Sequence, residues 1–184
     1  MEVIFLLIGI LGLVMFFFGM KTLIKKYRSR TIAELNFTEN PSEIYIKKTG
    51  TYAVCIIGGG YANNKGDFDL HITNNGNKLD VLEKQMKFKF RHKGKLATEF
   101  YHFEIKNMGK YKFEFKNIAD LEAKESMLLS KRMFQNTLSV NNVGIVIKET
   151  SSNTKFIIGL LMAVFGFNIA GLGIILAFNP QLYM

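Results

Sequence analysis

Apolar residues are concentrated at the two ends of the chain, and they alternate with polar residues in between. The C-terminal run reads FIIGLLMAVFGFNIAGLGIILAF and contains no charged side chain and one polar one, Asn168. As a helix these residues rise about 34 Å, which is enough to cross a hydrocarbon core of roughly 30 Å. We therefore predict a transmembrane helix over residues 156–178.

A second apolar run begins at Val3 and extends past Lys21, whose aliphatic stem can run along the helix to the membrane surface. A cleaved signal peptide is the alternative. It would need a basic N-terminal region, but that region holds only Glu2, and the stretch FFFGMKTLIKK offers no small-residue cleavage site. We predict a retained signal anchor that crosses the membrane over residues 3–24.

Small residues recur on one face of the C-terminal helix. They follow one another at steps of 4, 3, 4, 3 and 4, which brings all of them to one side of an α-helix. Close backbone contact is a main source of helix association in lipid, so this small-residue face predicts a packed neighbour. Gly9, Gly12 and Gly19 share a face of the first helix and are candidates to meet it, although glycine is common in membrane helices generally. The six positions of the C-terminal face are Gly159, Ala163, Gly166, Ala170, Gly173 and Ala177.

Asn168 lies roughly 180° from the small-residue face, at 100° per residue. An amide in the middle of a span is disfavoured toward lipid and tends to find a hydrogen-bond partner. Because the first helix can cover only one of the two faces, we predict at least one protein partner within the membrane, either another copy or a different protein. The alternative is that the amide bonds to a carbonyl of its own preceding turn or to a local water.

The middle of the chain, residues 31–150, has the alternating pattern of β-strands. Residues 86–91, 101–106 and 111–116 alternate apolar and polar side chains without a break. Turn signals rich in Gly and Asn separate them from similar segments at 44–47, 67–72 and 145–147. We predict an all-β antiparallel sandwich or small barrel of seven or eight strands. One stretch, residues 118–133, is rich in helix formers and predicts a short helix.

A weak internal repeat supports this fold class. Residues 44–56 align with residues 103–115, and each copy has an alternating strand, the pattern Gly-x-Tyr, and another alternating strand. The pattern is Gly50-x-Tyr52 in the first copy and Gly109-x-Tyr111 in the second. Glycine allows a positive φ at the corner and the tyrosine packs over it, as in the tyrosine corner of Greek-key sandwiches.

Charge orients the two predicted spans. Five basic residues lie at the inner end of the first span and two, Lys148 and Lys155, precede the second, whereas no Lys or Arg lies beyond either outer end. The positive-inside rule then places the β-domain in the cytoplasm and both termini outside. Export of the domain is the alternative. The bias toward Lys, Asn, Ile and Phe is typical of an AT-rich bacterial genome, so we predict an inner-membrane protein. The five residues are Lys21, Lys25, Lys26, Arg28 and Arg30.

The chain has a net charge of +9. The densest basic cluster lies at residues 87–95, with Phe88 and Phe90 between the charges. The alternation puts these rings on the face opposite the charges, so they belong to a core and not to a base-stacking platform, which argues against nucleic acid. We predict contacts with anionic membrane lipids, the alternative being a solvated strand face. The predicted lipid contacts are Lys21, Lys25, Lys26, Arg28, Arg30, Lys87, Lys89 and Arg91.

Residues with catalytic chemistry are sparse and not grouped. Cys55 is the only cysteine, which excludes an intramolecular disulfide, and no base stands near it in the sequence. The run Gly58-Gly59-Gly60 lacks the spacing of a phosphate loop and predicts a flexible turn. His71 and His102 occupy outward positions of their strands, and no metal-binding spacing is present. We predict no catalytic residue, no metal and no cofactor.

These observations favour a non-enzymatic binding protein, a small accessory or regulatory subunit that presents a β-domain to a protein partner at the inner membrane. A first alternative is an immunity protein that neutralises a membrane-acting toxin. A second alternative is a ligand-gated membrane-disrupting effector or channel, which would need polar residues along a pore.

Overall fold

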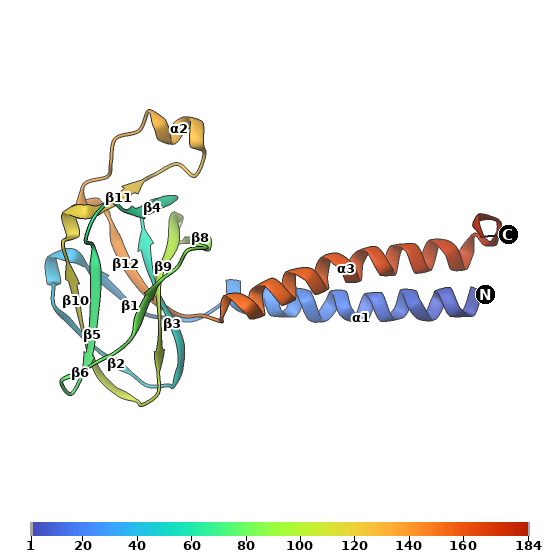
Figure 1. Cartoon of the computed structure of the whole chain (residues 1–184), viewed down its shortest axis with the longest axis horizontal. Coiled ribbons are helices and arrows are strands. Elements are labelled where there is room, and N and C mark those ends of the chain that lie inside the picture. Colours follow the sequence, from blue (N-terminus) through green and yellow to red (C-terminus); the bar gives the residue numbers. More distant parts are fainter. Residues whose placement is uncertain (1, 184) are drawn as a thin grey trace. The chain divides into compact units, whose positions relative to one another are not determined.

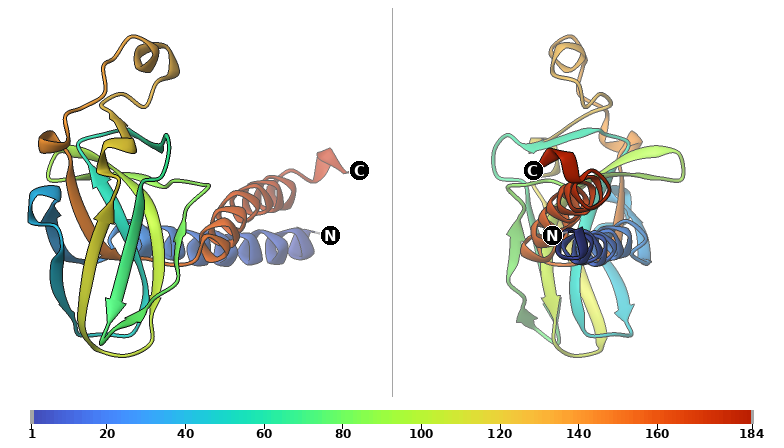
Figure 2. Two further views of the ribbon diagram at one scale, coloured as in Figure 1. Left: turned by 60° about the vertical axis from the view of Figure 1, so that its left-hand side comes forward. Right: turned by 90° about the vertical axis from the view of Figure 1, so that its right-hand side faces the viewer.

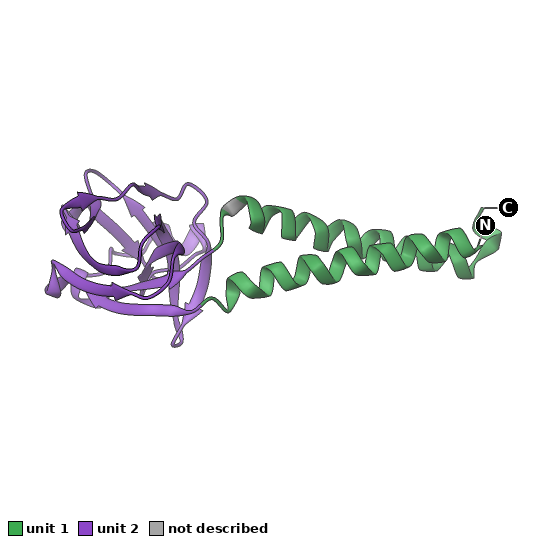
Figure 3. Cartoon of the chain, turned by 90° about the horizontal axis from the view of Figure 1, so that it is seen from below, with its two compact units in different colours: residues 1–29, 151–184 green, residues 30–150 purple. Residues whose placement is uncertain are grey.

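The computed structural model describes residues 2–183, and the chain divides into two compact units. One unit contains residues 1–29 and 151–184, and the other contains residues 30–150 (Figure 3). The first is helical and the second is built from antiparallel sheets. The coarse arrangement predicted from the sequence, two long apolar helices flanking an antiparallel β-domain, is therefore confirmed.

The helical unit consists of α1 (Glu2–Tyr27) and α3 (Asn153–Phe178), each of 26 residues, followed by the short turn η4 (Pro180–Leu182). The two helices run antiparallel and pack against each other (Figure 2). Ser152 caps α3, because its hydroxyl accepts a hydrogen bond from the Lys155 amide at 3.3 Å. Each helix is long and apolar enough to cross a membrane.

The larger sheet of the β-unit has six strands, all antiparallel (Figure 1). Its order is β1 (Thr31–Asn36), β12 (Gly144–Glu149), β3 (Gly50–Ile57), β9 (Lys95–Ile105) and β7 (Val81–Glu83), and β8 (Lys89–His92) also pairs with β9.

Two smaller sheets complete the β-unit. The four-stranded sheet has the order β2 (Ser42–Ile46), β10 (Gly109–Lys116), β5 (Asp69–Asn74) and β6 (Asn77–Lys78). A two-stranded sheet pairs β4 (Tyr61–Asn64) with β11 (Leu121–Lys124). The short helical turns are η1 (Phe37–Glu39), η2 (Ile118–Asp120), α2 (Leu129–Met133) and η3 (Val140–Asn142).

All three sheets contribute side chains to one main hydrophobic core, in which Tyr52, Phe103 and Phe113 are at most 2% exposed. A smaller core lies on the opposite face of the six-stranded sheet. It contains Cys55, which alternates with the main-core positions of β3, and Phe90 from β8. The central strand β3 is therefore buried on both faces.

Both tyrosine corners form. The Tyr52 hydroxyl donates to the Lys48 carbonyl at 2.6 Å, and the Tyr111 hydroxyl donates to the Asn107 carbonyl at 2.6 Å. Gly50 has a φ of 147° at the first corner, and its counterpart at the second corner has a φ of 157°. Each corner thus joins the hydroxyl of one strand to the backbone four residues earlier, as the internal repeat predicts.

Two predicted elements need correction. The helix expected over residues 118–133 is helical only at η2 and at α2, because Leu121–Lys124 pair with β4 and are largely buried there, so tertiary pairing overrides helix propensity. The strand expected over residues 86–91 begins only at Lys89. Its neighbour β9 has a β-bulge, because Phe100 is an extra residue between the partners of Val54 and Cys55. On the other side of β9, two short strands pair with it in place of one long strand: β8 with the residues before the bulge and β7 with those after it.

The chain enters and leaves the β-unit at adjacent points. Thr31 at the start of β1 lies opposite Lys148 near the end of β12, and the Glu149 amide donates to the Arg30 carbonyl at 2.9 Å. The two connections to the helices therefore leave from neighbouring strands of one sheet.

Candidate functional site

The small-residue faces of the two helices lie against each other. A methyl group added at Gly12 would lie 2.8 Å from the Gly166 carbonyl oxygen, and one added at Gly166 would lie 2.8 Å from the Gly12 carbonyl oxygen. Neither distance leaves room for a Cβ atom. The backbones are in direct contact here, which is the packing that small residues permit in lipid.

The same contact extends along the pair. Gly19 lies against Gly159 and Ala163, and a methyl group added at Gly173 would lie 2.6 Å from the Gly9 Cα atom. Of the nine predicted packing residues, Ala177 alone is half-buried and the other eight are buried, namely Gly9, Gly12, Gly19, Gly159, Ala163, Gly166, Ala170 and Gly173.

Asn168 lies on the exposed side of α3, and its amide is bonded within its own helix. The Nδ2 group donates to the Val164 carbonyl at 2.8 Å, four residues earlier. This bond to the preceding turn is the alternative to a protein partner within the membrane. This bond satisfies one of the amide's hydrogen-bonding groups. Asn168 therefore needs a hydrogen-bond partner on a neighbouring helix less than its position in the sequence suggests.

The predicted lipid-contacting residues of α1 and of the connection that follows it differ in their surroundings. Lys21, Lys25, Arg28 and Arg30 are exposed. The Lys26 ammonium instead lies 4.6 Å from the centroid of the Phe156 ring, which holds the side chain against α3.

The three predicted lipid-contacting residues between positions 87 and 91 also differ in their surroundings. Lys87 is occupied within the unit, because its ammonium donates to Glu83 at 2.8 Å and to the Ala62 carbonyl at 3.2 Å. Lys89 is half-buried and Arg91 is exposed. Of these three, Arg91 is the most accessible to an external anion.

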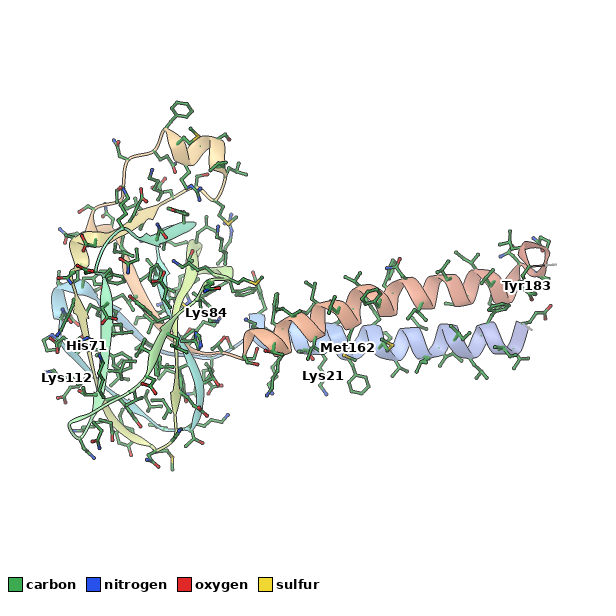
Figure 4. All side chains as sticks on the ribbon, viewed as in Figure 1. Lys21, His71, Lys84, Lys112, Met162 and Tyr183 are labelled. Carbon is green, nitrogen blue, oxygen red and sulfur yellow. The ribbon has the colours of Figure 1, made fainter. Side chains whose placement is uncertain are left out.

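A buried ion pair lies on the face of the six-stranded sheet that carries the smaller core. It was not predicted from the sequence. Lys84 and Glu99 form a salt bridge with both side chains at most 2% exposed (Figure 4 labels Lys84). The Thr150 hydroxyl donates to the other carboxylate oxygen of Glu99 at 3.2 Å. Lys148 is also buried, with its ammonium 3.8 Å from the centroid of the Phe90 ring, and burial lowers its pKa.

One sequence signal could have predicted this second buried layer. The run YAVCII over residues 52–57 is apolar at every position, which is typical of a strand covered on both faces. No sequence signal distinguishes Lys84, Glu99 or Lys148 from ordinary surface charges, because their burial depends on pairing between distant strands.

Cys55, His71 and His102 lie in different surroundings. Cys55 is fully buried, and burial raises the pKa of its thiol, so the nucleophilic thiolate is disfavoured. His71 lies in the four-stranded sheet with its Nε2 atom 3.0 Å from Asp69, whereas His102 lies in the six-stranded sheet. Burial and the nearby Lys84 ammonium lower the pKa of His102.

Within residues 2–183 no cluster of three or more His, Cys, Asp or Glu side chains could hold a metal ion. Comparison with protein-family models, with curated protein sequences and with solved structures finds no match to this chain.

Proposed function

We propose that this chain is a non-enzymatic inner-membrane protein, an accessory or regulatory subunit whose paired transmembrane helices hold a β-domain that recognises a protein partner. The observation that carries the proposal is the construction of the helix pair. Glycine and alanine fill its inside, and large apolar side chains cover its outside. A helix pair in water has the reverse arrangement.

The outer surface of the helix pair supports a lipid environment. Leu7, Phe17, Phe167 and Leu172 are each more than 60% exposed. An apolar surface of this extent would drive aggregation in water and is matched by acyl chains. A 26-residue helix rises about 39 Å, so each helix exceeds the hydrocarbon thickness and leaves its ends at the headgroups.

The distribution of charge supports a cytoplasmic β-domain. Lys21, Lys25, Arg28 and Arg30 are exposed at the end of α1 nearest the β-domain in the sequence, and no Lys or Arg follows Lys155. Under the positive-inside rule this end faces the cytoplasm and both termini face outward.

The β-domain is proposed to be an antiparallel sandwich. Two observations support this finer assignment: the two tyrosine corners, and a single core that takes side chains from all three sheets. A sandwich of this kind offers rigid strands and exposed loops, which suit recognition of a partner.

The non-enzymatic part of the proposal rests on the placement of the reactive groups. Cys55 is buried away from any substrate, and the charges of Lys84 and Glu99 neutralise each other inside the domain. The domain is therefore expected to act by binding, through the shape and charge of its surface. The expected second neighbour within the membrane would contact the Asn168 face, since the small-residue face is occupied by α1.

The proposal is tested by purifying the full chain in mild detergent from the membranes of its source cells. The control is a chimera in which residues 30–150 are replaced by an unrelated compact domain while both helices are kept. We expect a partner in fixed stoichiometry with the full chain and its loss from the chimera. A monodisperse full chain without any partner would contradict the proposal, and a partner retained by the chimera would move recognition to the helices.

A further inference from the structure

The segment between β11 and β12 projects from the sheets and carries the short helix α2 at its end (Figure 1). Five large apolar side chains of this segment are exposed, and Phe134 is 89% exposed. An exposed apolar group of this size on a folded domain marks an interaction surface. We call these five residues the apolar tip: Met127, Leu128, Leu129, Met133 and Phe134.

The apolar tip is held in place by polar contacts at its base. The Ser126 amide donates to the Gln135 side chain at 3.0 Å, which closes the two sides of the segment. Lys124 donates to the Arg132 carbonyl at 3.1 Å, and the Arg132 guanidinium lies 3.9 Å from the centroid of the Tyr61 ring. These contacts fix α2 against the β4–β11 pair, so the apolar side chains are displayed by an anchored base.

Basic residues lie within the segment and near its base. Between residues 126 and 138 the only charged side chains are Lys131 and Arg132, and Lys131 is exposed. A hollow at the base of the segment is lined by Arg91 and Lys95 from the β8–β9 hairpin, together with one acidic residue, Glu125. Basic residues from two separate parts of the sequence therefore lie at and near the base of the tip.

An anionic bilayer surface has the matching chemistry. Leu, Met and Phe side chains on a convex segment can enter the boundary between headgroups and acyl chains, while the cations around them remain among the phosphates. A protein partner would need a groove of fixed shape for the same side chains. The domain is also tethered by short connections, residues 28–30 and 150–152, to the helices that are proposed to cross the membrane. Short tethers keep the effective concentration of the domain at the bilayer high.

We propose that the apolar tip inserts into the bilayer that carries the chain's own helices and that anionic lipid strengthens this contact through the surrounding cations. The inference rests on the proposed membrane anchoring. It gives the domain a second attachment to the membrane, which would fix its orientation there.

The absence of tryptophan from the sequence provides a direct test. Phe134→Trp in the full chain introduces a single fluorophore at the tip. The protein is reconstituted into vesicles of phosphatidylcholine alone or mixed with phosphatidylglycerol, with brominated acyl chains as quenchers. We expect a blue-shifted emission that is quenched several-fold more strongly in the mixed vesicles. Adding Lys131→Glu should reduce the quenching in the mixed vesicles while the far-ultraviolet circular dichroism stays unchanged.

Two further single-tryptophan variants separate this inference from the proposed anchoring. Phe167→Trp on the exposed side of α3 should be quenched in both lipids, and Tyr45→Trp on β2 should be quenched in neither. Water-like emission from Phe134→Trp in both lipids, with Phe167→Trp quenched, would overturn the inference alone. Equal quenching of Phe134→Trp in both lipids would overturn the role of anionic lipid. An unquenched Phe167→Trp would contradict the anchoring itself.

Discussion

At the scale of single residues, the most unusual feature is the charge buried behind the six-stranded sheet. Glu99 is the only carboxylate described there. It forms an ion pair with Lys84, and its negative charge favours the protonated form of Lys148. A buried charge is costly without a counter-charge, so the two lysines depend on this one carboxylate.

Glu99→Gln should therefore destabilise the β-domain by roughly 3–5 kcal/mol, the cost typical of removing one partner from a buried pair. Chemical denaturation of the full chain in detergent, followed by the β-sheet signal in circular dichroism, measures this change. Glu104→Gln provides a matched control on the same strand, because Glu104 is exposed. Similar losses for the two variants would contradict a structural role for the buried pair.

The stability of the β-domain should also depend on the neutral state of His102. Burial lowers the pKa of this imidazole in the folded state, and its Nδ1 atom has no hydrogen-bond partner among the described residues. The unfolded chain therefore binds a proton first as the pH falls below about 6.5, and stability declines from there down to the folded-state pKa.

Replacing His102 by Gln should flatten this decline below about pH 6.5. Thermal melting at a series of pH values measures the effect, with His71→Gln as the control for loss of an imidazole elsewhere. An unchanged pH profile in His102→Gln would show that other groups cause the decline.

At the scale of elements, the tyrosine corners join loops to strands through single hydroxyl groups. Tyr52→Phe should cost about 1 kcal/mol of β-domain stability, because it removes the 2.6 Å bond to Lys48 and leaves the carbonyl without that donor. Denaturation curves for Tyr45→Phe should be unchanged, since Tyr45 is 56% exposed. Equal effects would mean that the corner hydroxyl is not a specific support.

The helix pair depends on backbone contact and should not accept larger side chains on its inner face. Gly12→Leu should lower the stability of the pair by about 1–3 kcal/mol or more, because the new side chain would meet the Gly166 carbonyl. The midpoint of SDS-induced unfolding in mixed micelles measures this loss. Gly171→Leu is the control on the same helix pair, because a Cβ atom at Gly171 has no other atom within 4 Å. Equal shifts in the two variants would argue against the contact.

At the scale of the whole molecule, hydrophobic patterning predicted the two terminal helices and the β-domain because these depend on local periodicity. The Gly-x-Tyr repeat predicted both corners for the same reason, since each bond joins residues four apart. The small-residue faces indicated close packing and left the partner open. The structure brings the face of α3 against α1.

The sequence failed where distant segments decide the local structure. Residues 121–124 have helix propensity and form a strand because β4 pairs with them. Lys84 and Lys148 have the composition of surface residues and are buried because β8 and its preceding loop cover the sheet. The apolar tip reads as the buried face of a short amphipathic helix, and its exposure follows only from the tertiary structure.

We propose above all that the helix pair crosses the inner membrane with the β-domain on its cytoplasmic side. Labelling with a membrane-impermeant thiol reagent in intact cells tests it most directly. Cys55 is buried and cannot report, so it is replaced by Ala, and single cysteines are placed at exposed positions by Met108→Cys in the β-domain and Gln181→Cys after α3. We predict that Gln181→Cys is labelled in intact cells and Met108→Cys only after permeabilisation. Labelling of Met108→Cys in intact cells would place the domain outside, and equal labelling at both positions would show that the bilayer does not separate them.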